Sequence, residues 1–186
     1  MLRFPAECDV QMRNHWFYSD HDEHMVKSLD ELLGLYYLSI DRGANLLLNI
    51  GPNREGLLPR KDKKHLLALG SEVMRRFSHP IASFDHCVLE NGTWYYEAEQ
   101  SHLLDHIVIE EDLTLGESVE SFVIRVVTAH SAAEVTVYEG RNIGHKAIIR
   151  LPAVKIRGVI LDITESEGEP AIRCLSLHYA GDATGL

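Results

Sequence analysis

The sequence predicts an α+β protein in two parts: a helix–strand–helix segment of α/β type over residues 1–80, then an antiparallel β-sandwich over residues 81–186. Residues 28–41 and 60–77 carry apolar side chains at helical spacing, and the short apolar run 45–50 lies between them. After Pro80, short runs of alternating or β-branched residues are separated by turn sequences, and no helical period interrupts them. The change at 78–83 therefore predicts a domain boundary.

Composition and charge limit the class of protein. A chain of 186 residues that is 45% hydrophobic and 25% charged is typical of a soluble globular protein. Its net charge of -10 argues against nucleic-acid binding through a basic surface. The apolar runs are too short to span a membrane, and the first ten residues lack the order of a signal peptide. We expect a soluble protein and leave its compartment open.

The three cysteines predict no metal site. Cys8, Cys87 and Cys174 are far apart, odd in number and never in CxxC spacing. We interpret them as isolated thiols, and we expect neither a metal nor a cofactor.

The first part has clear helix signals. Ser28 and Glu31 have the spacing of a capping box, and Gly43 is placed to end that helix. Pro59 lies near the start of the second helix, and Ser78-His79-Pro80 ends it. The predicted buried side of that helix consists of Leu66, Leu67, Leu69, Val73 and Phe77.

The run 45–50 predicts a strand buried on both faces of a parallel sheet. Asn45 and Asn49 are then expected to satisfy backbone groups at the ends of the strand. Only the N-terminal FPAECDV offers a convincing parallel neighbour. We therefore expect the sheet to be completed by another copy or by a missing barrel-bearing chain, or the two helices to pack against the sandwich.

The second part predicts a series of short strands. Asn91-Gly92, Glu139-Gly140 and Glu167-Gly168-Glu169-Pro170 are among the turn sequences between them. The expected strands are 84–89, 93–99, 105–110, 119–128, 134–139, 146–151, 155–163 and 171–179.

Several polar clusters look catalytic or metal-binding on paper. The stretch SDHDEH, with His21 and His24 beside His15, precedes the Ser28 cap and indicates a solvated loop, so we do not expect a metal there. The Asp85-His86 and Asp105-His106 pairs lack a nucleophile in a Gly-x-Ser-x-Gly turn. We expect surface or strand-edge histidines at both places.

The stretch NGTWYYEAE could carry a carbohydrate platform or could supply core residues. Alternation along a strand sends Trp94 and Tyr96 to one face and Tyr95 to the other. At least one of the three is therefore expected in the core.

The segments PAECDVQMRNHWFY, VKSLDELLGLYYLSI and GANLLLNIGPNREGLLP together resemble the end of the catalytic barrel of α-L-fucosidases of glycoside hydrolase family 29. IVIEEDLTLGESVESFVI, GRNIGHKAIIRLP and PAIRCLSLHY resemble the C-terminal β-sandwich of that family. The resemblance covers almost the whole chain. It implies a (β/α)8 barrel, here incomplete, followed by a β-sandwich of jelly-roll or carbohydrate-binding-module type.

The resemblance also implies site residues. Retaining glycosidases need a nucleophile and an acid/base carboxyl group about 5–5.5 Å apart, and the family's nucleophilic Asp lies on a barrel strand that has no counterpart in this chain. Glu7 then corresponds to the acid/base region, at the end of a buried strand; the alternative is an exposed terminal carboxylate. Trp16 corresponds to a sugar-contacting aromatic; the alternative is packing beneath the next helix. The family implies no metal requirement.

The leading hypothesis is thus the C-terminal portion of an α-L-fucosidase that releases terminal fucose from fucosylated glycans and is inactive as this isolated chain. The alternative is a stand-alone carbohydrate-binding or protein-interaction β-sandwich module.

Overall fold

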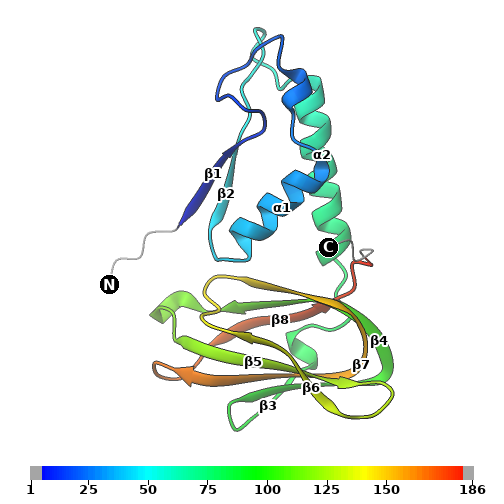
Figure 1. The fold of residues 1–186 in the computed structure, drawn as a ribbon. Helices are drawn as coiled ribbons and strands as arrows, with labels where there is room; N and C mark the ends of the chain where they lie inside the picture. Colours follow the sequence, from blue (N-terminus) through cyan, green and yellow to red (C-terminus); the bar gives the residue numbers. More distant parts are fainter. Residues whose placement is uncertain (1–5, 182–186) are drawn as a thin grey trace. The chain divides into compact units, whose positions relative to one another are not determined.

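The computed structural model describes residues 6–181, apart from the side chain of Leu115. The chain divides into two compact units, Met1–Arg75 and Arg76–Leu186 (Figure 1). Within the described residues, no helix is long and apolar enough to cross a membrane.

The first unit is built on one β-α-β crossover. Strands β1 (Glu7–Gln11) and β2 (Asn45–Asn49) pair in parallel, and α1 (Leu29–Ile40) connects them after a short 3-10 turn at Glu23–Met25. Parallel strands need such a crossover connection, which explains why a helix lies between them in the sequence. After β2 the chain enters α2 (Arg60–Phe77), as predicted.

The ends of α1 are set by the residues that the sequence indicates. The Ser28 side chain accepts a hydrogen bond from the Glu31 amide while the Glu31 carboxylate accepts one from the Ser28 amide, which forms the predicted capping box. Beyond the helix, Gly43 has a φ of 72°, a left-handed conformation that favours glycine.

The apolar core of the first unit lies between the two helices and the loop after β1. Leu32 and Leu33 of α1 meet Leu69 of α2, together with Met12 and Val26. The prediction for α2 is wrong at one position. Leu67 is 60% exposed, because it lies about 100° around the helix from Leu66 and so leaves the buried face.

The prediction that β2 is buried on both faces is also wrong. Leu47 is 49% exposed, and among the described residues the sheet contains β1 and β2 alone. The expected polar roles of the flanking asparagines are not seen either. Asn45 is exposed, and the buried Oδ1 of Asn49 has no hydrogen-bond partner among the described residues.

The second unit is a strongly bent antiparallel sheet with the strand order β3-β4-β7-β5-β6, in which β8 pairs with β4. Its strands are β3 (Val88–Glu90), β4 (Thr93–Glu111), β5 (Val119–Thr128), β6 (Glu134–Gly140), β7 (Ala147–Ser166) and β8 (Ile172–His178). Short 3-10 turns lie at η2 (Phe84–His86) and η3 (Leu113–Leu115).

Two long strands let this sheet fold over a common core. The runs expected as four separate strands merge into β4 and β7, whose pairing register shifts between Glu97 and His102 and again between Leu104 and His106. Such bulges bend a strand without ending it. The resulting fold fits a β-sandwich, and Figure 1 shows β4 and β7 curving along one side of it.

The expected strand at 84–89 is instead η2 followed by the short β3. The amide of Ser83 donates to His86 Nδ1 and the His86 amide donates to the Ser83 carbonyl, so this segment closes into a turn before a strand can begin.

Candidate functional site

Two loops leave the same edge of the β1–β2 sheet. Because the strands are parallel and in register, the segments that follow Gln11 and Asn49 both start at the carboxyl edge. In parallel α/β folds, ligand sites lie at that edge. A cavity of about 490 Å³ is found there, lined by Phe17, Tyr18, Ser19, Asp20, His21, Pro52, Asn53 and Arg54.

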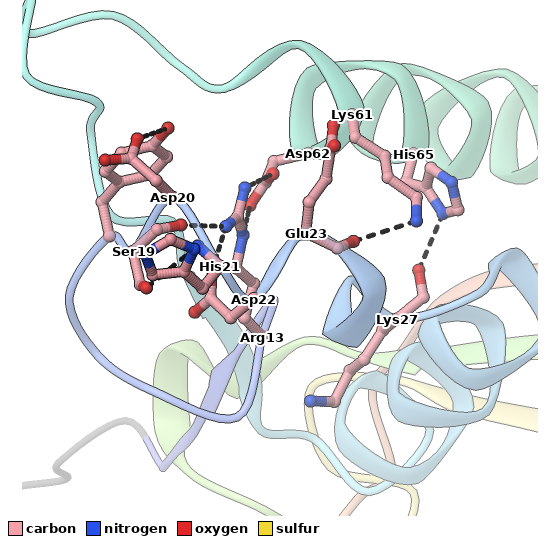
Figure 2. A network of polar contacts seen from close by, with 11 residues as sticks. Arg13, Ser19, Asp20, His21, Asp22, Glu23, Lys27, Lys61, Asp62 and His65 are labelled. Carbon is pink, nitrogen blue, oxygen red and sulfur yellow. Dashed lines mark hydrogen bonds and ion pairs between the residues drawn. The ribbon is translucent and has the colours of Figure 1, made fainter.

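A buried arginine anchors the first loop to α2 (Figure 2). Arg13 donates from Nε to Asp62 Oδ1 at 2.9 Å and from Nη2 to Asp62 Oδ2 at 2.6 Å. Its Nη1 donates to the Ser19 carbonyl at 3.1 Å and pairs with Asp22. Arg13, Asp22 and Asp62 are each at most 5% exposed. The hydrogen bond to Asp62, more than any other contact, raises the pKa of Arg13 above its usual range, so the guanidinium stays charged.

Two more contacts tie the end of this loop to the same helix. Lys61 Nζ donates to the Glu23 carbonyl at 2.9 Å, and His65 Nδ1 lies 2.7 Å from the Lys27 carbonyl. Figure 2 shows that these contacts and the Arg13 cluster reach the loop from the first turns of α2. The loop is therefore held at both ends by side chains.

A glycine lets the two loops approach each other. A Cβ added to Gly51 would lie 2.6 Å from the Tyr18 amide nitrogen and 3.0 Å from the Phe17 carbonyl carbon. Both atoms belong to the backbone and cannot rotate away. Gly51 is thus required for the contact between the loops that brings Pro52–Arg54 next to Phe17–His21.

We expect Gly51→Ala to destabilise the first unit by about 2 kcal/mol, the usual cost of forcing extra volume into a closed contact. Urea denaturation followed by Trp16 fluorescence in a Trp94→Phe background measures this. The control is Gly34→Ala in α1, where an added Cβ meets nothing within 4 Å and alanine favours the helix. Equal stabilities of the two variants would contradict the proposed close contact.

The cavity wall carries a chain of polar contacts. The Tyr18 hydroxyl donates to Asp20 Oδ1 at 2.8 Å, and Arg54 Nη2 pairs with Asp20 Oδ2 at 2.8 Å. The hydrogen bond between Tyr18 and Asp20 lowers the pKa of Asp20 and raises the pKa of Tyr18. Asp20 therefore stays ionised near neutral pH and is suited to accept hydrogen bonds from hydroxyl groups.

Known proteins resemble this chain in sequence and in fold. A family model described as Alpha-L-fucosidase matches residues 2–76. The chain is 28% identical to Alpha-L-fucosidase 1 of Arabidopsis thaliana, in an alignment that covers 94% of this chain and 40% of that protein. A candidate α-L-fucosidase from Bacteroides thetaiotaomicron superposes with a TM-score of 0.88 at 28% identity, over 94% of this chain and 41% of that one.

Residues 2–76 thus match the α-L-fucosidase family, and the likeness to individual fucosidases extends over most of the chain. A glycoside hydrolase 29 family member from an unknown rumen bacterium has the same fold, with a TM-score of 0.87 at 24% identity over 97% of this chain and 34% of its own length. The chain spans about two fifths of the length of the curated relative from Arabidopsis.

Three consecutive aromatic residues, among them the predicted sugar contact Trp16, lie at or next to the cavity. Phe17 and Tyr18 line it, and Trp16 immediately precedes them but is not a lining residue. Trp16 is 44% exposed and Phe17 is 85% exposed. The ring of Phe17 therefore lies almost wholly in solvent, and Trp16 is close to half exposed.

Glu7 lies at the opposite edge of the sheet. It is exposed and opens β1, paired with Asn45 at the start of β2. Four residues at about 3.3 Å each separate it from the carboxyl edge, or about 13 Å. The assumption that Glu7 ends a buried strand is therefore wrong, because the strand runs from Glu7 toward Gln11.

The stretch SDHDEH is not simply a solvated loop. Asp22 is 4% exposed because it pairs with Arg13, and Glu23–Met25 form a 3-10 turn. No group of three or more His, Cys, Asp or Glu side chains within residues 6–181 could hold a metal ion. Nothing in the spacing of Arg13 and Asp62, 49 residues apart, indicates their contact in advance.

The second unit holds a buried pair that the sequence did not lead us to expect. Asp105 and His106 are 5% and 3% exposed, so the prediction of surface or strand-edge residues is wrong there. Asp105 Oδ1 lies 2.7 Å from His106 Nδ1, and the Asp105 carboxylate accepts the amides of Ala180 and Gly181. Burial tends to raise the pKa of Asp105, but these hydrogen bonds outweigh it and lower the pKa.

His178 is the cross-strand partner of His106 and lies within 2.8 Å of the Ser176 hydroxyl through Nε2. Burial, together with the nearby His106 and Lys146, lowers the pKa of His178 to about 4, although Asp105 and the Arg76 backbone act in the opposite direction. In the unfolded chain His178 titrates near pH 6.5, whereas in the folded protein it stays neutral down to about pH 4.

We expect the second unit to lose stability as the pH falls from 6.5 to 4, because the unfolded state takes up the proton first. The loss is on the order of 2 kcal/mol. Urea denaturation followed by Trp94 fluorescence in a Trp16→Phe background measures it. His178→Gln should remove most of this slope while His130→Gln, at an exposed turn, should leave it. Equal slopes in both variants would assign the effect to other groups.

Proposed function

We propose that this chain is the C-terminal portion of a retaining α-L-fucosidase that acts on fucosylated glycans. In this proposal β1, α1, β2 and α2 form the end of a (β/α)8 barrel, and the second unit is its jelly-roll β-sandwich. The observation that carries it is the similarity to α-L-fucosidases along 94% of the chain, combined with a cavity at the carboxyl edge.

The residues around the cavity support a role in binding. Phe17 and Tyr18 offer aromatic faces, on which the C–H face and the methyl group of a 6-deoxy sugar can pack. Asp20 and Arg54 offer an acceptor and donors for sugar hydroxyls. In the proposed enzyme this loop pair forms one wall of the fucose site, and Trp16 closes its rim.

The same residues support the proposal that the isolated chain does not hydrolyse fucosides. Double displacement needs two carboxyl groups with separate roles. Near the cavity, Asp22 forms an ion pair with Arg13. Asp20 accepts a hydrogen bond from Tyr18 and pairs with Arg54. Glu7 lies at the far edge of the sheet and stays a candidate acid/base residue only if further barrel strands bring a substrate to it.

The exposed apolar residues of the first unit support a missing neighbour. Leu38, Leu47, Leu57, Leu67 and Met74 are each at least 49% exposed. Large exposed apolar side chains on one small unit usually contact other protein. We propose that further barrel elements, or a second copy of the chain, cover them.

Hydrolysis of 4-nitrophenyl α-L-fucoside tests the proposal. The chain alone should release no nitrophenol above the uncatalysed rate. Turnover that disappears in Glu7→Gln would show that one chain holds a complete active site, and the proposal would then be wrong about inactivity. Turnover that survives in Glu7→Gln would remove Glu7 from the acid/base role as well.

A further inference from the structure

An exposed aromatic residue, Tyr95, lies on the outer face of the sheet in the second unit. Trp94 and Tyr96 point into the core, where Tyr96 is 9% exposed and Trp94 packs on Phe84 with ring centroids 4.6 Å apart. Tyr95 points the other way, as strand alternation requires, and is 39% exposed. No hydrogen bond within residues 6–181 engages its hydroxyl group.

The ring of Tyr95 lies beside an apolar residue that it helps to cover. Tyr95 pairs with Ile160 of β7, and Ile160 pairs with Arg125 of β5. Ile160 faces outward, since its neighbours Val159 and Leu161 belong to the core, and yet it is only 4% exposed. Directly paired side chains on one face are close enough to touch. Tyr95 and Arg125 therefore cover Ile160 from both sides.

A fixed polar array borders the aromatic ring. The Asp162 carboxylate accepts from Thr93 Oγ1 at 2.6 Å through Oδ1 and pairs with Arg125 Nη2 through Oδ2. Arg125 Nε lies 3.6 Å from Glu134 Oε2, too far for a hydrogen bond. These side chains come from four neighbouring strands, and those of Asp162, Arg125 and Glu134 are about one fifth to one half exposed, so oriented donors and acceptors face solvent next to the ring.

The charge around this array selects the kind of ligand. Glu90, Glu97 and Glu134 share the outer face with Tyr95, by the pairing register and the alternation of the strands. The guanidinium of Arg125 already pairs with Asp162. An anionic ligand would meet net negative charge here, whereas a neutral polyol can accept from the guanidinium and donate to the carboxylates.

We propose that this face, defined by Tyr95, Arg125, Asp162 and Thr93, is a second carbohydrate-binding site for a neutral sugar ring of an oligosaccharide. The apolar face of the pyranose packs on Tyr95 while its hydroxyls bond to the Arg125–Asp162 pair. Such a site lets the second unit bind a glycan independently of any fucoside hydrolysis. It does not depend on the function proposed above.

Saturation-transfer NMR and calorimetry of the whole chain with cellotetraose, lactose and 2′-fucosyllactose test this site. We expect at least one of the three probes to bind, and Tyr95→Ala to weaken that binding tenfold or more. Tyr95→Phe should retain most of it because the ring is kept. Tyr138→Ala is the matched control, because Tyr138 is 40% exposed on the edge strand β6 but points to the core side of the sheet.

Thermal unfolding of each variant shows whether the fold is kept, and a surface aromatic should cost little. No binding of any probe by the parent chain at millimolar concentration would overturn the proposal. Binding that is lost in Trp16→Ala but kept in Tyr95→Ala would overturn it too, because the sugar would then sit at the loops of the first unit. That second outcome would leave the proposed fucosidase function intact.

Discussion

Asp62→Asn is expected to destabilise the first unit by about 3–5 kcal/mol, the usual cost of breaking a buried ion pair. Asp62 is 1% exposed and binds Arg13 through both carboxylate oxygens. In the variant an amide group replaces one oxygen and faces a guanidinium donor, so a buried charge loses an acceptor. Urea denaturation followed by Trp16 fluorescence in the Trp94→Phe background measures the change.

This variant should also release the loop that lines the cavity, because Arg13 joins α2 to Ser19 and Asp22. Limited proteolysis should then cut within residues 14–22 faster than in the parent chain. Asp20→Asn is the control: it removes a carboxylate from an exposed pair with Arg54, and it should not shift the urea midpoint measurably. Equal effects of the two substitutions would refute the anchoring role of Arg13.

Glu111→Gln is expected to destabilise the second unit by about 3 kcal/mol, because it leaves buried donors without an acceptor. Glu111 is 1% exposed at the end of β4. Its Oε1 accepts from the amide and hydroxyl of Ser118 and from the Val119 amide, and its Oε2 lies 3.3 Å from the Gly144 amide. One carboxylate thus holds the turn before β5 to the turn before β7.

The adjacent Glu110 provides the control for this second prediction. Its carboxylate pairs with the partly exposed Lys146 and Arg173, and no buried backbone amide within residues 6–181 depends on it, so Glu110→Gln should cost about 1 kcal/mol. Trp94 fluorescence in the Trp16→Phe background reports both variants. A loss at Glu110 that matches the loss at Glu111 would mean that general charge, and not the buried hydrogen bonds, stabilises the turns.

The sequence could predict what local signals determine. The Ser28–Glu31 capping box and Gly43 set both ends of α1, and these signals act within a few residues. The strand at 119–128 could also be predicted, since β5 alternates between core and outer face from Phe122 to Val127. The opposite directions of Tyr95 and Tyr96 follow from the same period of two.

Contacts between residues far apart in the chain could not be predicted from local sequence patterns. The burial of Asp22 depends on Arg13 and Asp62, and Asp62 comes 40 residues later in the chain. The burial of His106 depends on its pairing with β8, which brings His178 beside it. The exposure of Leu47 reflects a sheet with two strands among the described residues, whereas an apolar run alone suggests cover on both faces.

We propose that the loops at the carboxyl edge of β1 and β2 form part of a fucose site. Amide chemical shifts of the whole chain in a titration with L-fucose test it most directly. We predict shifts at residues 16–21 and 52–54 and at the Trp16 indole, larger than those caused by L-galactose, which carries a hydroxymethyl group in place of the methyl. Shifts of equal size with D-glucose, or none at these residues, would contradict the claim.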